Sequence, residues 1–374
     1  MTSRCRKGLW AALTASTLLL GLATGCADLG YLVQSASGHV GVLWASRPVD
    51  DWLTDPATPA ALRERLPLSQ RLRDFAITEL GLPDNASYRR YADLGRPAVV
   101  WNVAAAPEFS LTLRTWCFPV AGCVGYRGYY READAQAHAE TLRAQGLETT
   151  VYPVPAYSTL GKLNALGGDP LLNTFIRRSE PDLAGLLFHE LAHQVVYVPG
   201  DTTFNESYAT TVERLGVQRW MQHAHGLQAA DTQQALTQQI EQRRQDWHQL
   251  LVRHRQRLEA LYRQPLGAPA MRAEKTRLIA LLRDEYVQLQ QRWGGYTGYD
   301  ASLNRLNNAT LGMQATYTQH VRAFEHLFQQ QGQNFTQFHT RVRELAQLPS
   351  IERSRVLEQL ASLRPALGAS AAQP

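Results

Sequence analysis

Cysteine is scarce in this chain, since only four of its 374 residues are cysteines. Cys117 and Cys123 lie close together in "WCFPVAGC", but no second pair and no neighbouring histidine accompanies them. A zinc site built from thiolates therefore has little support, because such sites usually combine two pairs of ligands. In an oxidising compartment we expect these two residues to form a small disulfide loop, with Pro119 and Gly122 allowing the turn.

Long apolar runs are lacking as well, and the N-terminal one is short. The run from Leu9 to Ala23 falls below the about 20 residues that a membrane-spanning helix needs. It follows a basic start with Arg4, Arg6 and Lys7, and it is followed by small residues and Cys26. This order is typical of an export signal rather than of a membrane anchor.

The residues before Cys26, Leu22-Ala23-Thr24-Gly25, resemble a bacterial lipobox, although alanine stands at 23 where leucine is most usual. The resemblance implies that residues 1–25 are a lipoprotein signal peptide and that the mature chain begins at an acylated Cys26. Such a lipid would hold the protein in the bacterial cell envelope, on the outer rather than the inner membrane, facing the periplasm. A plain signal peptide and an uncleaved anchor are the alternatives.

A strong charge of either sign is also missing. The formal net charge is +5, and removal of the signal takes away three positive charges and no negative one, which leaves +2. This balance gives no electrostatic footprint for nucleic acid, so nucleic-acid binding is excluded as a function class. Hydrophobic residues at 44% and charged residues at 19% are instead ordinary for a folded globular protein.

The middle of the chain alternates between helical and extended patterns. Residues 62–85 predict a helix that ends at Gly81 and Pro83. Residues 96–106 and 109–118 predict two strands that could form a hairpin, 131–146 a helix, and 147–157 another strand. Residues 86–160 are therefore expected to form a small mixed α/β layer. From Ser179 onward almost every segment has a helical pattern.

A long helical hairpin is expected between residues 228 and 293. Apolar residues keep a helical stripe on both sides of "RQPLGAPA", a Pro- and Gly-containing break. Two antiparallel helices with a charged outer face satisfy this pattern. The hairpin could serve as a scaffold or as an arm that binds a protein partner. The final residues, 365–374, are expected to be a disordered tail.

The sharpest motif lies in "LLFHELAHQVVYVPGDTTFNESYATT", residues 186–211. His189 and His193 are four residues apart, so on a helix their imidazoles lie on one face and can bind Zn²⁺ together. Glu190 can reach a metal-bound water and act as its general base. Chance matches to HExxH occur in unrelated helices, but this helix is nearly uncharged, and an unpaired Glu190 would be costly to bury there. We therefore predict one zinc ion per chain.

A catalytic zinc site needs a third protein ligand. Glu206, on the helix that follows, is our first candidate, although Thr203 and Glu206 also fit a capping box with no metal role. Glu213 lies further along the same helix and could instead be a hydrogen-bond partner of a histidine ligand. Asp201 follows Pro199-Gly200 in a turn, where it could bind the metal or form an Asx turn.

These motifs resemble those of a known family, the predicted zinc aminopeptidases of Gram-negative bacteria, which are lipoproteins with HExxH followed by an N-E-[ST]-[YF]-A segment. The resemblance covers most of the mature chain. It includes the segment quoted above, "GCADLGYLVQSASGHVGVL", "YRGYY", "AYSTLG" and "LNNATLGMQATYTQHVRAF". It implies a gluzincin-like metallopeptidase that acts on peptide substrates.

The same comparison directs attention to two further places. Tyr317, on an expected late helix, could donate a hydrogen bond to the oxyanion of the tetrahedral intermediate, or it could be an ordinary half-buried residue. The segment "VPAYSTLG", residues 154–161, could be an edge strand that pairs with an extended peptide. An ordinary strand and turn is the alternative.

We expect an α+β fold that is mostly helical, with a zincin-like core made of a small mixed sheet and the HExxH helix. The expected segments are a signal peptide (1–25), a tether (26–60), the core (61–227), a helical domain with the hairpin (228–364) and the tail (365–374). The expected function is that of a lipid-anchored zinc metallopeptidase, an aminopeptidase. The alternative is a non-catalytic envelope scaffold with a structural metal, for which four protein ligands would be normal.

Overall fold

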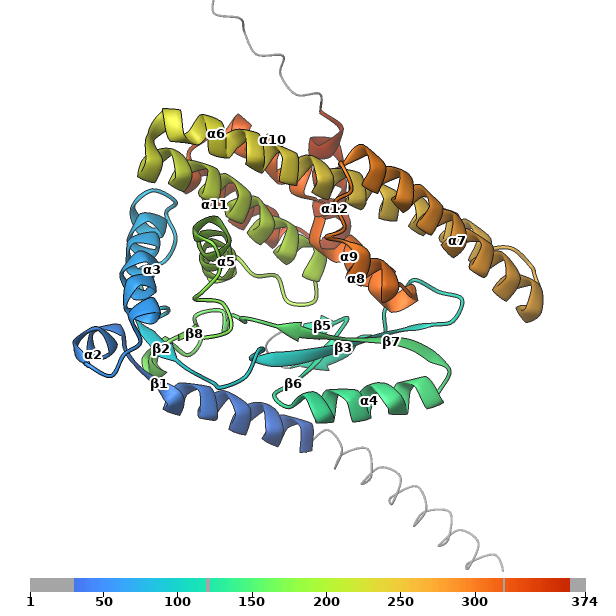
Figure 1. The fold of residues 1–374 in the computed structure, drawn as a ribbon. Helices are drawn as coiled ribbons and strands as arrows, with labels where there is room; N and C mark the ends of the chain where they lie inside the picture. Colours follow the sequence, from blue (N-terminus) through green and yellow to red (C-terminus); the bar gives the residue numbers. More distant parts are fainter. Residues whose placement is uncertain (1–29, 119–121, 319, 364–374) are drawn as a thin grey trace, which may run out of the picture.

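A computed structural model describes residues 30–118, 122–318 and 320–363, without the side chains of 227–238, 241 and 314–318. The predicted signal peptide, the acylation site Cys26 and the tail at 365–374 lie outside these residues. Figure 1 shows a small central sheet with a helix of residues 30–45 and α4 (Glu132–Ala144) below it, and α5 (Glu180–Ala192) and α6 (Thr202–Tyr262) above it. Within the described residues, no helix has both the length and the hydropathy to cross a membrane.

The central sheet has the strand order β6-β3-β7 and is antiparallel throughout. Its middle strand, β3 (Val100–Pro107), is buried along almost its whole length because helices cover both faces of the sheet. β6 (Arg127–Tyr129) and β7 (Leu147–Val154) flank it. A second sheet, β1-β2-β8, joins β1 (Ser46–Pro48), β2 (Arg90–Ala92) and β8 (Leu171–Leu172), and a short ribbon joins β4 (Trp116–Phe118) to β5 (Gly122–Val124).

Two strand predictions need correction. In the segment 109–118, only β4 is a strand, and it pairs with β5 rather than with β3. The apolar alternation there has another cause, because Phe109 and Leu111 pack into the core of the helical hairpin. The strand expected at 147–157 is β7, which ends at Val154. Of the two alternatives for 154–161, the structure has the ordinary strand and turn, with Leu160 at φ +56°.

The predicted helices at 62–80 and 131–146 are confirmed as α3 (Ala60–Thr78) and α4. Ser179 caps α5, because its side chain accepts a hydrogen bond from the Asp182 amide at the start of this helix. The Thr203–Glu206 capping box is wrong. α6 begins at Thr202, and its cap is Asp201, whose carboxylate accepts from the Phe204 amide.

α6 contains a turn that its length hides. Gly226 has φ +71° and ψ 171°, a conformation outside the helical range, and it divides α6 into two arms. Figure 1 shows these arms running back along each other. The second arm forms the predicted hairpin with α7 (Ala268–Arg292), and the two share a core that includes Leu250, Leu258 and Leu282.

The remaining helices belong to different cores. α8 (Asp300–Asn304) and α9 (Asn308–Thr318) lie beside the hairpin, and α9 also packs on β3 and β7. α10 (Val321–Gln330), α11 (Phe335–Gln347) and α12 (Ser350–Ser362) return to the first arm of α6 and join the main core with α3 and α5. Residues 228–364 thus contribute to two cores.

Candidate metal centre

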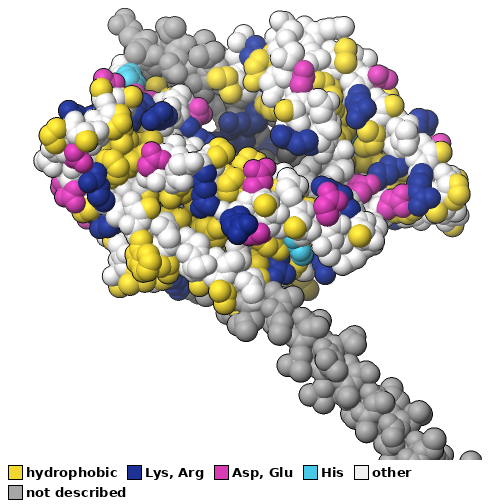
Figure 2. Space-filling model, turned by 60° about the horizontal axis from the view of Figure 1, so that its bottom comes forward, with side chains coloured by type: hydrophobic (Ala, Val, Ile, Leu, Met, Phe, Trp, Pro, Cys, Tyr) yellow, Lys and Arg dark blue, Asp and Glu magenta, His cyan; other side chains and the backbone are white. Residues whose placement is uncertain are grey.

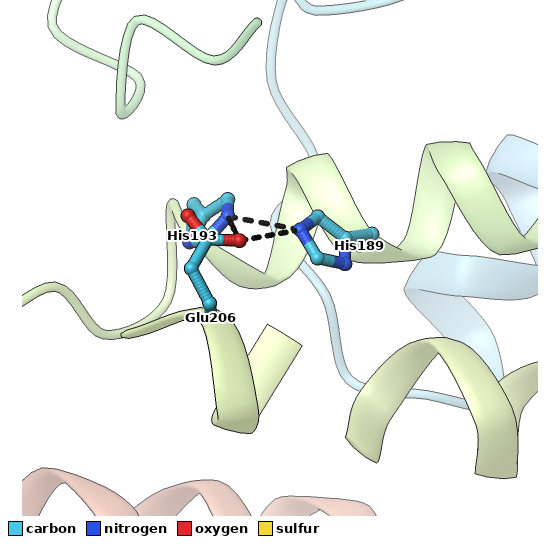
Figure 3. Close-up of side chains that lie close together, drawn as sticks. All are labelled: His189, His193 and Glu206. Carbon is cyan, nitrogen blue, oxygen red and sulfur yellow. Dashed lines mark hydrogen bonds and ion pairs between the residues drawn. The ribbon is translucent and has the colours of Figure 1, made fainter. Parts of the chain in front are cut away.

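The two motif histidines lie at the end of α5, where the helix meets the first turns of α6. His189 is in the last turn, and His193 is the residue that caps the helix. Glu206, near the start of α6, points between their rings (Figure 3). All three side chains are at least four-fifths buried, so the structure brings together the two predicted histidine ligands and the first candidate for the third.

The separations of the donor atoms are those of a coordination shell. His189 Nε2 lies 3.2 Å from His193 Nε2 and 3.2 Å from Glu206 Oε2, and His193 Nε2 lies 3.7 Å from the same oxygen. Bonds of about 2.0–2.1 Å to a tetrahedral Zn²⁺ place neighbouring ligand atoms roughly 3.3 Å apart. The three residues therefore fit a zinc ion both in chemistry and in spacing.

Glu213 lies behind the cluster rather than in it. Its Oε2 is 3.1 Å from His189 Nδ1, and a carboxylate can only accept there, so Nδ1 carries the proton. Nε2 of His189 is then the nitrogen that faces Glu206 and His193. Gly185, one turn before His189, allows this contact, because a side chain there would approach Glu213 Cγ to 3.2 Å. This arrangement is that of a group that orients a metal ligand.

Asp201 does not reach the cluster. One oxygen caps α6, and the other receives two hydrogen bonds from Arg353 of α12, at 2.7 and 3.1 Å. Arg353 is nearly buried, and it also donates to the Leu348 carbonyl. Asp201 is therefore held by a structural ion pair.

The segment between α5 and α6 explains why Glu206 is held so firmly. The side chain of Asn205 donates to the Val198 carbonyl and accepts from the Val198 amide, both at 2.8 Å. This pair imitates a strand contact and fixes the loop that connects the two helices. Ser207 accepts from the His320 amide, and Tyr208 bonds to His339. The residues on both sides of Glu206 are thus buried anchors, which leaves only Glu206 to point at the histidines.

The electrostatics of the cluster distinguish its members. Burial raises the pKa of Glu190 to about 7, and the negative charges of Glu206 and Asp169 act in the same direction. Burial lowers the pKa of His193 to about 4, which leaves it neutral and able to bind a metal. Burial also opposes ionisation of Glu206, but the two histidines outweigh it, and its pKa is lowered overall. Glu190 is therefore the one carboxylate here suited to exchange a proton near neutral pH.

A cavity of ≈ 370 Å³ lies beside the start of α6. Thr203, one turn before Glu206, lines it, and so do Tyr126, Arg255 and Met313. The Tyr126 hydroxyl has a pKa raised well above its usual value by burial and then by the charge of Glu206. The volume of the cavity lies within the range of binding clefts for small ligands.

Cys123, at the end of the disulfide turn, lines this cavity. Cys117 and Cys123 are bonded to each other, and the turn approaches the loop before α6 so closely that a side chain at Gly122 would meet the Gly200 amide at 2.5 Å. Tyr317 belongs to α9, but its side chain is not among those described. Tyr126 was missed as a site residue by the sequence reasoning, and its position in "YRGYY" was the only indication.

Comparison with known proteins gives one match. A family model described as "Putative aminopeptidase" matches residues 30–357. The match begins after the predicted lipidation site and ends within α12, so it includes both arms of α6 and the residues His189, His193 and Glu206. No curated protein and no solved structure matches the chain.

Proposed function

The chain belongs to the putative aminopeptidase family, and on this premise we propose that it is a zinc-dependent metallopeptidase that removes residues from the N-terminus of peptides. The observation that carries the proposal is the spacing of His189 Nε2, His193 Nε2 and Glu206 Oε2, which all lie within 4.8 Å of one another. Three protein ligands leave a fourth position for reaction, as catalytic zinc sites do.

The side chains around the cluster have distinct roles in this proposal. A bound Zn²⁺ would polarise the peptide carbonyl and lower the pKa of a water molecule to about 7. Glu190 takes the proton from the attacking water and passes it to the leaving amine. Glu213 keeps the proton of His189 on Nδ1 and thereby directs Nε2 inward. The cavity lined by Tyr126 and Thr203 holds the peptide, and Tyr317 of α9 donates to the oxyanion.

The protein is also proposed to be attached to a membrane by a lipid. The lipobox-like segment before Cys26 supports a mature chain that is acylated at this residue. The protein would then be held on a membrane of the bacterial envelope, preferably the outer one, with its catalytic core in the periplasm. The disulfide between Cys117 and Cys123 is in keeping with an oxidising compartment.

A structural metal in a non-catalytic scaffold is the second candidate function. The long hairpin favours it, because its outer face could bind a protein partner. Against it, the metal-ligand group found among the described residues has three members, not the four of a structural site. Glu190, with a pKa of about 7 beside this group, has a role in the peptidase and none in the scaffold.

The decisive experiment combines metal analysis with peptide cleavage. Purified protein should contain about one zinc per chain and release the N-terminal residue from unblocked peptides. N-terminally acetylated peptides are the control for exopeptidase action, because an aminopeptidase does not cleave them. Protein that contains zinc but cleaves neither kind of peptide would favour the scaffold. Cleavage of both kinds would indicate an endopeptidase.

A further inference from the structure

The N-terminal helix, residues 30–45, is attached to the central sheet by its inner face. Gln34 donates to the Gly128 carbonyl and accepts from the Tyr130 amide. His39 Nδ1 lies 2.5 Å from the Tyr157 hydroxyl, and Val42 is almost fully buried. These contacts fix the rotation of the helix about its axis, so the opposite face is permanently directed outward.

This outer face is apolar, which is unusual for an exposed helix. Its large exposed side chains are Leu32, Val33, Val40 and Trp44, and Trp44 is 86% exposed. Positions 33, 40 and 44 follow the spacing of one helical face. Residues 30–45 contain no Asp, Glu, Lys or Arg, whereas the solvent face of a surface helix normally carries charged groups. Figure 2 shows this side of the molecule, with hydrophobic side chains exposed to the left of the departing grey trace.

We propose that the outer face of residues 30–45 lies in the interfacial layer of a lipid bilayer and fixes the orientation of the protein on the membrane. An uncharged helix with a tryptophan near one end matches the interfacial region, where Trp is enriched. The helix is too short to span the membrane. The inference rests on the anchoring part of the proposed function, since Cys26 lies only four residues before Gly30 and an extended chain of that length reaches about 14 Å.

The proposed contact places the candidate metal centre on the side of the protein that faces away from the bilayer. The helix of residues 30–45 lies on one side of the central sheet, and α5 and the first arm of α6 lie on the other (Figure 1). With the helix on the bilayer, His189, His193 and Glu206 face away from the lipid. Peptides would then reach the site from the aqueous compartment, and membrane-embedded segments would not.

The test uses nitroxide labels on the acylated full chain in vesicles of phosphatidylethanolamine and phosphatidylglycerol. Single cysteines replace Val40 or Trp44 (Val40→Cys, Trp44→Cys). Ile351→Cys on α12 is the matched control for Trp44, because these residues are 88% and 86% exposed, and the same label without vesicles is the reference for Val40, which is 39% exposed. We expect labels at 40 and 44 to collide several-fold less with a water-soluble nickel complex than the label at 351, and more with oxygen dissolved in the bilayer. Trp44→Asp combined with Val40→Cys should restore aqueous access, whereas Ile351→Asp combined with Val40→Cys should not.

Two results would overturn the inference. Labels at 40 and 44 that are as accessible to the nickel complex as the label at 351 exclude a bilayer contact. Protection that is seen only in native envelopes, and not in pure lipid, would assign the face to a protein partner. Intact mass reports acylation separately. An acylated, vesicle-bound chain with aqueous labels contradicts this inference alone, and a chain without lipid that does not bind vesicles contradicts the proposed anchor as well.

Discussion

Glu206 and Asp201 are close in sequence, and at the residue scale their contacts give them separate roles. Glu206→Gln removes the negatively charged oxygen that would bind the metal, so we expect zinc content and peptidase activity to be lost together. Asp201→Asn still offers a capping oxygen, but it removes the charge that pairs with the nearly buried Arg353. We expect it to keep its zinc and to lower the free energy of unfolding by roughly 2 kcal/mol. Metal analysis and urea denaturation of both variants check this, and a zinc-free Asp201→Asn beside a zinc-loaded Glu206→Gln would reverse the assignment.

Glu213 permits a graded test of the same cluster. Its carboxylate contacts His189 Nδ1 and none of the other ligand atoms, so Glu213→Gln should weaken zinc binding without abolishing it. Partners of this kind typically change metal affinity by about 10–100-fold. Competition with a chelator measures the change. A variant with unaltered affinity would show that the contact does not orient His189.

Glu190→Gln separates the general base from the ligands. The amide has almost the shape of the carboxylate but cannot accept a proton from water, so turnover should fall by about 10²–10⁴. Zinc content should stay at the wild-type level, because Glu190 is not part of the ligand group. Steady-state kinetics and metal analysis on one preparation check both statements. Loss of zinc in this variant would instead make Glu190 a ligand.

Sequence alone could predict residues whose role depends on local spacing. His189, Glu190 and His193 form such a set, since four residues on a helix fix their geometry. The role of Asp201 could not be predicted, because its partner Arg353 lies 152 positions later in the chain. Tyr126 is another such case, because the charge of Glu206 that helps to raise its pKa comes from a different element. Contacts between segments far apart in the chain determine the roles of these residues, and local sequence patterns do not predict such contacts.

At the scale of elements, α11 supports the start of α6 through one buried histidine. His339 donates from Nε2 to the Leu80 carbonyl and accepts at Nδ1 from Tyr208, which lies two residues after Glu206 on α6. Burial lowers the pKa of His339 to about 4. The contact therefore ties the end of α3 and the start of α6 to α11, provided that the imidazole stays neutral.

This contact predicts a pH dependence of stability. Between pH 6.5 and about 4 the unfolded chain binds a proton at this position and the folded chain does not, so stability falls as the pH is lowered through this window. The part due to His339 should reach roughly 2 kcal/mol between pH 7 and pH 5. His339→Gln should reduce the difference in unfolding free energy between these two pH values, and the exposed His225→Gln is the control. Equal differences in both variants would contradict the assignment.

The elements themselves were predictable where their pattern is local. α3, α4 and the α6–α7 hairpin follow from helical stripes and from turn residues. The strand at 109–118 was predicted wrongly because an alternating apolar segment can pack against helices as well as against a sheet. The turn at Gly226 was not predicted as such, because a single glycine within a helical pattern is usually tolerated.

At the scale of the whole molecule, Gly226 determines how the two cores are joined. The first arm of α6 belongs to the main core with α5, and the second arm belongs to the hairpin core with α7. Burial opposes ionisation of Glu213 on the first arm, but the hydrogen bond with His189 lowers its pKa, and the charge of Arg244 on the second arm acts in the same direction. If α6 continued straight through residue 226, the hairpin would leave the body of the protein, and Glu213 would lose this neighbour.

Gly226→Ala tests this geometry. A φ of +71° with ψ of 171° is a conformation used almost only by glycine, and a side chain there costs about 1–3 kcal/mol. No atom lies within 4 Å of the added Cβ, so the loss of stability would come from the backbone alone. Gly41→Ala is the matched control, because Gly41 is helical, exposed and equally unobstructed, and it should raise stability by about 0.5–1 kcal/mol. Chemical denaturation measures both, and a Gly226→Ala protein as stable as the wild type would mean that α6 does not turn back at this residue.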